Sequence, residues 1–223
     1  MYLCFLNNFL TLILFPRMMK HILVPIGSKE NASNTLQYAI DFAKEIKAKV
    51  FVFRAYKVHS KAGTFINVNN ILERETNLYI QAVIGGVDTR GVDVKMISAK
   101  GATIDSIHAV DEELGIDLIV VGPRSNSIKE EVFLGSTSGS IVKQTEIPVL
   151  IVPEDYKFSL FKVALTAFKS GVLNQQNVLT PLEEIKSLFK TKINLLLVKT
   201  HEYKEEDLIV DASLKAIKNK IST

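Results

Sequence analysis

The sequence predicts an α/β protein with a doubly wound parallel five-stranded sheet, followed by a partial second α/β repeat. Five short apolar runs alternate with four segments in which apolar residues recur every three or four positions. This alternation is typical of buried parallel strands and the helices that connect them. The pattern then starts again after about 140 residues, which is too long a period for a solenoid and suits a tandem domain.

The five apolar runs predict strands at residues 21–26, 49–56, 92–98, 116–122 and 148–153. After the first strand and a turn, an amphipathic helix is marked by the apolar stripe Leu36, Ala39, Ile40, Ala43 and Ile46. Further helices are expected at 71–83, 104–114 and 138–144, with Thr103 as the N-cap of the second of these three. Each crossover is long enough to be right-handed, so the helices should cover both faces of the sheet.

The restarted pattern predicts strands at 161–168 and 192–200, a helix at 178–189 and a last helix at 208–217. We therefore expect one complete domain at 19–153 and an incomplete strand-helix-strand-helix repeat at 154–223. Such a fragment leaves an apolar sheet edge and face open unless something else covers them.

The first residues form a separate apolar extension. Residues 2–16 are apolar but fewer than the roughly 20 residues that a membrane-spanning helix needs. They lack the preceding positive charges and the small-residue cleavage site of a secretory signal. We expect that residues 1–17 come from a start codon placed upstream of the true one; the alternative is an anchor or export segment.

Composition narrows the classes of function. The chain has 223 residues, of which 47% are hydrophobic and 23% charged, which indicates a globular core. The net charge of +3 is spread along the chain without a dense basic run, so nucleic-acid binding is not expected. Cys4 is the single cysteine, which excludes an intrachain disulfide framework and fits a reducing, cytoplasmic location. We do not expect a membrane protein.

One stretch, from Gly122 to Pro153, is more specific than a general α/β pattern. Gly122 ends the fourth strand, and the next helix is opened by Gly135, Ser136, Thr137 and Ser138. A glycine permits close approach of the backbone, and the free N–H groups of a helix N-terminus attract phosphate. The hydroxyls of Ser136 and Ser138 could add donors. This is a strand-loop-helix anion site at the carboxyl edge of the sheet, where ligands of doubly wound folds bind.

The spacing of this stretch resembles the nucleotide motif of the universal stress protein family. That motif is a glycine, two residues, a second glycine, nine residues, then Gly-Ser or Gly-Thr. Here Gly122 is followed at the same spacing by Ser125 and by Gly135-Ser136. The runs ILVPI, DLIVVG and PVLIVP and the Gly101-Ala102-Thr103 turn are also similar to the family. The resemblance covers residues 19–153, implies a Rossmann-like, adenine nucleotide alpha hydrolase-like fold, and extends to 161–200 as the start of a second domain.

The resemblance also implies a binding site for ATP with Mg²⁺, or for AMP. Carried over position by position, the family's ligand contacts fall on Pro25, Ile26, Gly27, Ala55, Gly122, Arg124, Ser125, Gly135, Ser136, Thr137 and Ser138. Two positions depart from the binding pattern. Gly27 stands where binders have an aspartate, and Ser125 brings a Cβ where they have none. These departures argue for weak binding or none.

The resulting hypothesis is a non-enzymatic, cytoplasmic stress-response protein that holds an adenine nucleotide at the Gly122–Ser138 loop. One alternative is an interaction module with a degenerate site that binds no nucleotide. Another is a slow ATP hydrolase, which would need a metal-binding acid at Gly27. The resemblance implies a homodimer through the apolar edge strand Pro148–Val152.

Other polar residues have ordinary explanations. We expect Arg54 to be solvated or paired with an acid; the alternative is that it reaches a phosphate from the end of its strand. We expect His108 to lie on the surface. The spacing of His21, His59 and His201 does not suggest a metal site.

Overall fold

The computed structural model describes residues 19–27, 32–57, 68–123, 136–168 and 179–197. Its elements are β1 (His21–Pro25), α1 (Ala32–Ile46), β2 (Lys49–Tyr56), α2 (Val68–Gly85), β3 (Val94–Lys100), α3 (Thr103–Leu114), β4 (Leu118–Val121), α4 (Ser136–Gln144), β5 (Val149–Ile151), β6 (Val163–Phe168), α5 (Thr180–Phe189) and β7 (Lys192–Leu197).

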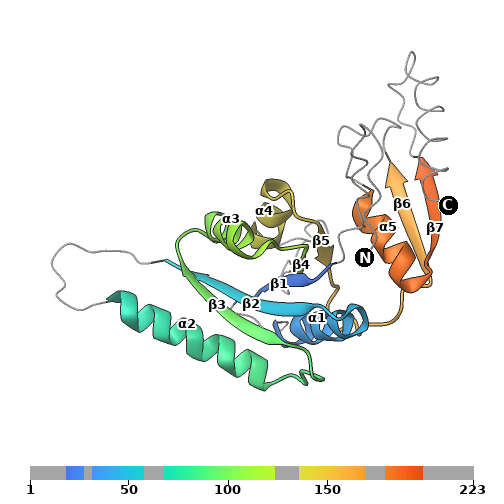
Figure 1. The fold of residues 1–223 in the computed structure, drawn as a ribbon. Coiled ribbons are helices and arrows are strands. Elements are labelled where there is room, and N and C mark those ends of the chain that lie inside the picture. The colour runs from blue at the N-terminus through green and yellow to red at the C-terminus, as the bar shows by residue number, and fades with distance from the viewer. Residues whose placement is uncertain (1–18, 28–31, 58–67, 124–135, 169–178, 198–223) are drawn as a thin grey trace, which may run out of the picture.

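The first five strands form one parallel sheet in the order β3-β2-β1-β4-β5. Helices α1 and α2 cover one face of this sheet, and α3 and α4 cover the other (Figure 1). The strand order reverses between β1 and β4, so the predicted doubly wound fold is confirmed.

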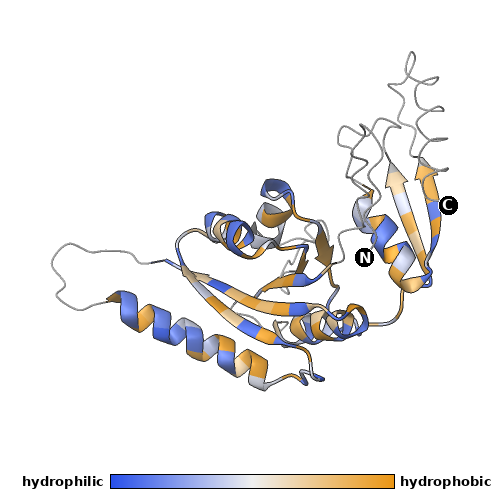
Figure 2. Ribbon diagram, in the orientation of Figure 1, coloured by the Kyte–Doolittle hydropathy of each residue, from blue (hydrophilic) through white to orange (hydrophobic). Residues whose placement is uncertain are grey.

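Two apolar cores hold the helices to the sheet, one on each face. Alternate residues of β1 belong to different cores, with Ile22 and Val24 facing α1 and α2, and Leu23 facing α3 and α4. All four residues of β4 are buried. This alternation explains why β1 and β4 are apolar throughout, because a strand covered on both faces has no solvent side. The strands are accordingly among the most hydrophobic parts of the ribbon (Figure 2).

The predicted helices and strands are present, with small changes at their ends. The apolar stripe of α1, from Leu36 to Ile46, is buried as expected. Thr103 is not the N-cap of α3. Ala102 has that role, because its carbonyl already accepts the N–H of Ser106 at 3.0 Å, and no side chain caps the helix. Strand β3 starts after Val92, whose N–H closes a turn on Thr89 at 2.8 Å.

The predicted restart of the pattern is present as well. Strands β6 and β7 are parallel, and Leu179, the N-cap of α5, and Leu182 within α5 pack on one face of the pair. The opposite face is open among the described residues, where Val163, Leu165 and Leu196 are 59%, 67% and 45% exposed. The helix predicted at 208–217 lies outside the described residues.

An aromatic cluster joins this second unit to the first. Phe42 of α1 packs on Phe158 and Phe161, which precede β6, and on Phe189 of α5, with ring centroids 5.7–6.0 Å apart. Phe42 is fully buried. The segment after β5 is therefore anchored on α1 by aromatic side chains.

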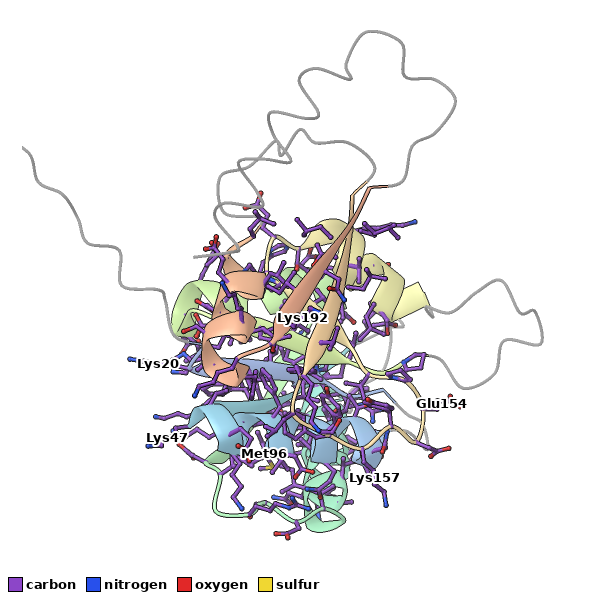
Figure 3. The ribbon with its side chains drawn as sticks, turned by 90° about the vertical axis from the view of Figure 1, so that its right-hand side faces the viewer. Lys20, Lys47, Met96, Glu154, Lys157 and Lys192 are labelled. Atoms are coloured by element: carbon purple, nitrogen blue, oxygen red, sulfur yellow. The ribbon has the colours of Figure 1, made fainter. Side chains whose placement is uncertain are left out.

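Among the described charged residues Glu184 alone is buried, at 7% exposure. Figure 3 shows Lys20, Lys47 and Lys157 at the periphery of the molecule. Within the described residues, no helix combines the length and the apolarity required to cross a membrane.

Candidate functional site

The candidate site is the edge of the sheet where β1 and β4 end side by side. The two strands are paired through Ile22 with Leu118 and Leu23 with Ile119. From β1 the chain continues to α1 on one face of the sheet, and from β4 it continues to α4 on the other. The N-termini of both helices therefore lie at this edge, where their N–H groups and dipoles favour an anion.

Gly122, which follows β4, is held by both helices. A Cβ built on Gly122 would lie 2.5 Å from Thr35 Oγ1, so the first turn of α1 packs where a side chain would otherwise stand. On the other side, Ser138 Oγ of α4 donates a hydrogen bond of 2.9 Å to the carbonyl of Gly122. Gly122 thus fixes the spacing between the two helix N-termini, in addition to any role in admitting a ligand.

The structure brings five of the expected contact residues to this edge: Pro25, Ile26, Gly27, Gly122 and Ser138. Pro25 is the last residue of β1, and the side chain of Ile26 is buried, its N–H bonded to Phe53 O at 2.9 Å. Ile26 could therefore offer a ligand little beyond its backbone atoms. Gly27 is exposed, and a Cβ built on it would have no atom within 4 Å. A Cβ at this position would therefore meet no steric obstacle.

The remaining contacts are only partly placed. Ala55 lies on β2 and packs against the core under α3 and α4. Thr137 is exposed in the first turn of α4, which begins at Ser136. Three expected contacts, Arg124, Ser125 and Gly135, lie outside the described residues.

Asn34 is a polar group that the sequence did not single out. It lies in the first turn of α1, next to Thr35, and its Nδ2 is buried without a hydrogen-bond partner. Buried amide donors are normally paired, so this one is available to an acceptor. A sequence gives little warning of such a residue, because it does not show which side-chain donors remain unpaired after folding.

Arg54 departs from its expected environment. Its guanidinium carbon lies 4.0 Å from the centroid of the Tyr79 ring, and no described carboxylate pairs with it. The expected pairing with an acid is therefore not met among the described residues, and α2 instead lays an aromatic ring over the half-buried Arg54. Tyr79 OH in turn donates a 2.6 Å hydrogen bond to Gly27 O. The spacing of Tyr79 from the buried residues Thr76, Ile80 and Val83 could have shown that it faces the sheet.

The histidines make only local contacts where they are described. His21 Nδ1 lies 2.7 Å from Leu114 O, and the exposed His108 has Nε2 3.1 Å from Gln144 O. His59 and His201 lie outside the described residues. Among the residues that the structure describes, no group of three His, Cys, Asp or Glu side chains could hold a metal ion.

Comparison with known proteins assigns the family. A family model described as the universal stress protein family matches residues 18–153. The chain belongs to the universal stress protein family. Similar members include universal stress protein MJ0531 of Methanocaldococcus jannaschii, 24% identical over 143 residues, which are 62% of this chain and 84% of that protein. YxiE of Bacillus subtilis is 28% identical over 147 residues, covering 60% of this chain and 99% of that protein.

Solved structures show the same fold. A universal stress protein from Archaeoglobus fulgidus superposes with a TM-score of 0.63 at 20% identity, covering 91% of this universal stress protein and 74% of that chain. Protein MJ0577 gives a TM-score of 0.50 at 24% identity and covers 63% and 99%. The likeness to the A. fulgidus chain thus reaches beyond the family-matched residues into the second unit.

Proposed function

We propose that this universal stress protein binds an adenine nucleotide at the sheet edge where β1 and β4 end. The phosphates would lie along Gly122 to Ser138, with the ribose and base over the ends of β1 and β2. The observation that supports this most is that Gly122 contacts both Thr35 of α1 and Ser138 of α4. These contacts hold the N-termini of the two helices together at the point where the strand order reverses.

The described residues supply specific groups for such a ligand. Asn34 Nδ2 is a buried donor with no partner, and the first turn of α4 offers free backbone N–H groups. The Ser138 hydroxyl hydrogen is already engaged by Gly122 O, so this side chain would first have to turn before it could donate to a phosphate. Gly27 brings no carboxylate, so Mg²⁺ would be held by the phosphates and water rather than by this residue.

The proposal is of a cytoplasmic binding protein that does not turn the nucleotide over. A hydrolase would need a group that positions metal or water at the phosphates, and the position nearest the end of β1 is Gly27, which has no side chain. The single cysteine of the chain fits a reducing compartment.

A thermal shift tests the proposal. At 100 times its dissociation constant, a ligand stabilises the folded state by about 2.7 kcal/mol. For a chain of this size that is a rise in Tm of roughly 5 °C or more. We expect ATP or AMP at millimolar concentration to produce such a rise and GTP to produce a smaller one.

The double variant Gly27→Asp, Ser125→Gly is the matched comparison, because it restores both positions that depart from the family's binding motif. A shift in the native protein supports the proposal, whatever the variant does. A shift in the double variant alone would show that the native chain is a non-binder on a nucleotide scaffold, and the proposal would be wrong.

A second function, homodimerisation through β5, is favoured by a separate observation. Strand β5 is at the edge of the sheet, Ile151 is 40% exposed, and Val149–Ile151 contains no charge to block pairing. Sedimentation should show a dimer that Ile151→Lys converts to monomer. Val163→Lys, at another exposed strand position, should leave the dimer intact; a native monomer would contradict this proposal.

A further inference from the structure

The side chain of Arg54 is held in a fixed place beside the end of β1. Val50 and Val52 face α1 and α2, so by the alternation of a strand Arg54 faces the same side. There α2 lies along β2 and β3 (Figure 1), and the Tyr79 ring stacks on the guanidinium at 4.0 Å. Because Tyr79 OH donates a hydrogen bond to Gly27 O, the ring links the guanidinium to Gly27, two residues after the end of β1.

One nitrogen of this guanidinium lacks an acceptor. Arg54 Nη1 is buried and has no hydrogen-bond partner, and no ion pair joins Arg54 to a described carboxylate. An arginine cannot lose its charge in a protein, and its fork of donors matches carboxylate or phosphate oxygens. Stacking on Tyr79 offsets only part of the free energy that is lost when a buried donor of a charged group has no hydrogen bond. An anion would supply the missing acceptor.

The position of Arg54 relates this anion to the nucleotide. The strand order β2-β1-β4 places Arg54 two strands from Gly122, a lateral distance of about 10 Å at the usual strand spacing. A ribose ring that carries phosphate on both sides bridges such a span. In dinucleotide-binding α/β folds, an acid at this edge binds a ribose hydroxyl, whereas a nearby arginine accommodates a phosphate on the ribose. Here Gly27 provides no acid, and Arg54 stands beside it.

We propose that Arg54 binds a second phosphate, attached to the ribose, so that the preferred ligand is an adenosine bisphosphate rather than AMP or ATP. This inference rests on the proposed nucleotide site, since it assigns the 5′-phosphate to the edge at Gly122 and the first turn of α4, and the 2′- or 3′-phosphate to Arg54. It also explains how the site could distinguish between nucleotides although Gly27 provides no carboxylate. The second phosphate of the ligand carries the negative charge, and Arg54 carries the positive charge that binds it.

Calorimetry on the full chain tests the assignment with three probes: AMP, adenosine 2′,5′-bisphosphate and adenosine 3′,5′-bisphosphate. At least one bisphosphate should bind about tenfold more tightly than AMP, as expected for charge-assisted hydrogen bonds. The better of the two identifies the ribose position. Arg54→Gln should abolish the preference. Arg54→Lys keeps the charge without the fork and should retain only part of it.

Lys57→Gln is the matched control, because Lys57 is an exposed cation just after β2. This variant should keep the full preference if a specific contact, rather than general positive charge, is responsible. Equal binding of AMP and both bisphosphates overturns the Arg54 assignment and leaves the nucleotide site standing. A preference that survives in Arg54→Gln, with the variant folded by circular dichroism, overturns it as well. If none of the three probes binds, both the site and the assignment are wrong.

Discussion

Replacing Gly122 by alanine should destabilise the protein by about 2 kcal/mol, the usual cost of forcing extra volume into a packed region. The added Cβ would lie 2.5 Å from Thr35 Oγ1, well inside the 3.0 Å that such atoms keep. Thr35 is itself buried at 4% exposure and cannot move aside freely. The first turn of α1 must therefore shift away from the end of β4.

The same geometry predicts a specific rescue. Thr35→Ala removes Oγ1 and Cγ2, and the new Cβ of residue 122 would then face only Thr35 Cβ, at an ordinary 3.7 Å. In that background the Gly122→Ala substitution should lower the free energy of unfolding by less than about 0.5 kcal/mol. A difference of that size is no larger than the usual scatter between independent mutations. The two substitutions should thus show a coupling energy of about 1.5–2 kcal/mol.

Urea unfolding of the native chain, the two single variants and the double variant, followed by far-UV circular dichroism, measures this coupling. Single-variant effects that simply add would refute the reasoning, since they would mean that Gly122 and Thr35 do not share space. A Gly122→Ala variant as stable as the native chain would refute it equally.

Three further predictions follow from the described contacts. Ser138→Ala removes the hydrogen bond to Gly122 O and should lower the free energy of unfolding by about 1 kcal/mol in a urea titration. Phe42→Ala should cost about 3–5 kcal/mol, because Phe42 is fully buried in the cluster with Phe158; limited proteolysis should then cut the segment after β5 earlier. Burial raises the pKa of Tyr38 from 10.0 to about 12. Its phenol ionises later in the folded than in the unfolded chain, so this residue's contribution to stability is complete below pH 10 and is lost as pH rises towards 12. An absorbance titration should show one late-ionising tyrosine, absent in Tyr38→Phe.

The fold could be predicted from the sequence because its signals are local. The apolar run of β1, the buried stripe of α1 and the restart at β6 each lie within a short stretch of chain, and the alternation of strand and helix leaves few topologies. The first and last residues of helices and strands are harder to predict from the sequence. Thr103 has the right side chain for an N-cap, yet the helix begins one residue earlier because the Ala102 carbonyl is already bonded.

The finer structure of the site could not be predicted, because it depends on contacts between distant parts of the chain. Thr35 meets Gly122 only after α1 has folded back onto β4. Likewise, Arg54 looked like a surface cation in the sequence, and only the packing of α2 shows that Tyr79 covers it. The glycine motif indicated where the site lies, whereas packing determines which donors there remain unpaired.

The most direct test of the proposed site is calorimetric titration of ATP and ADP, with Mg²⁺, into the full chain. The account predicts one site per chain with a dissociation constant in the micromolar range, about −8 kcal/mol. It would be contradicted by the absence of measurable heat, together with no thermal shift at millimolar concentrations of ATP.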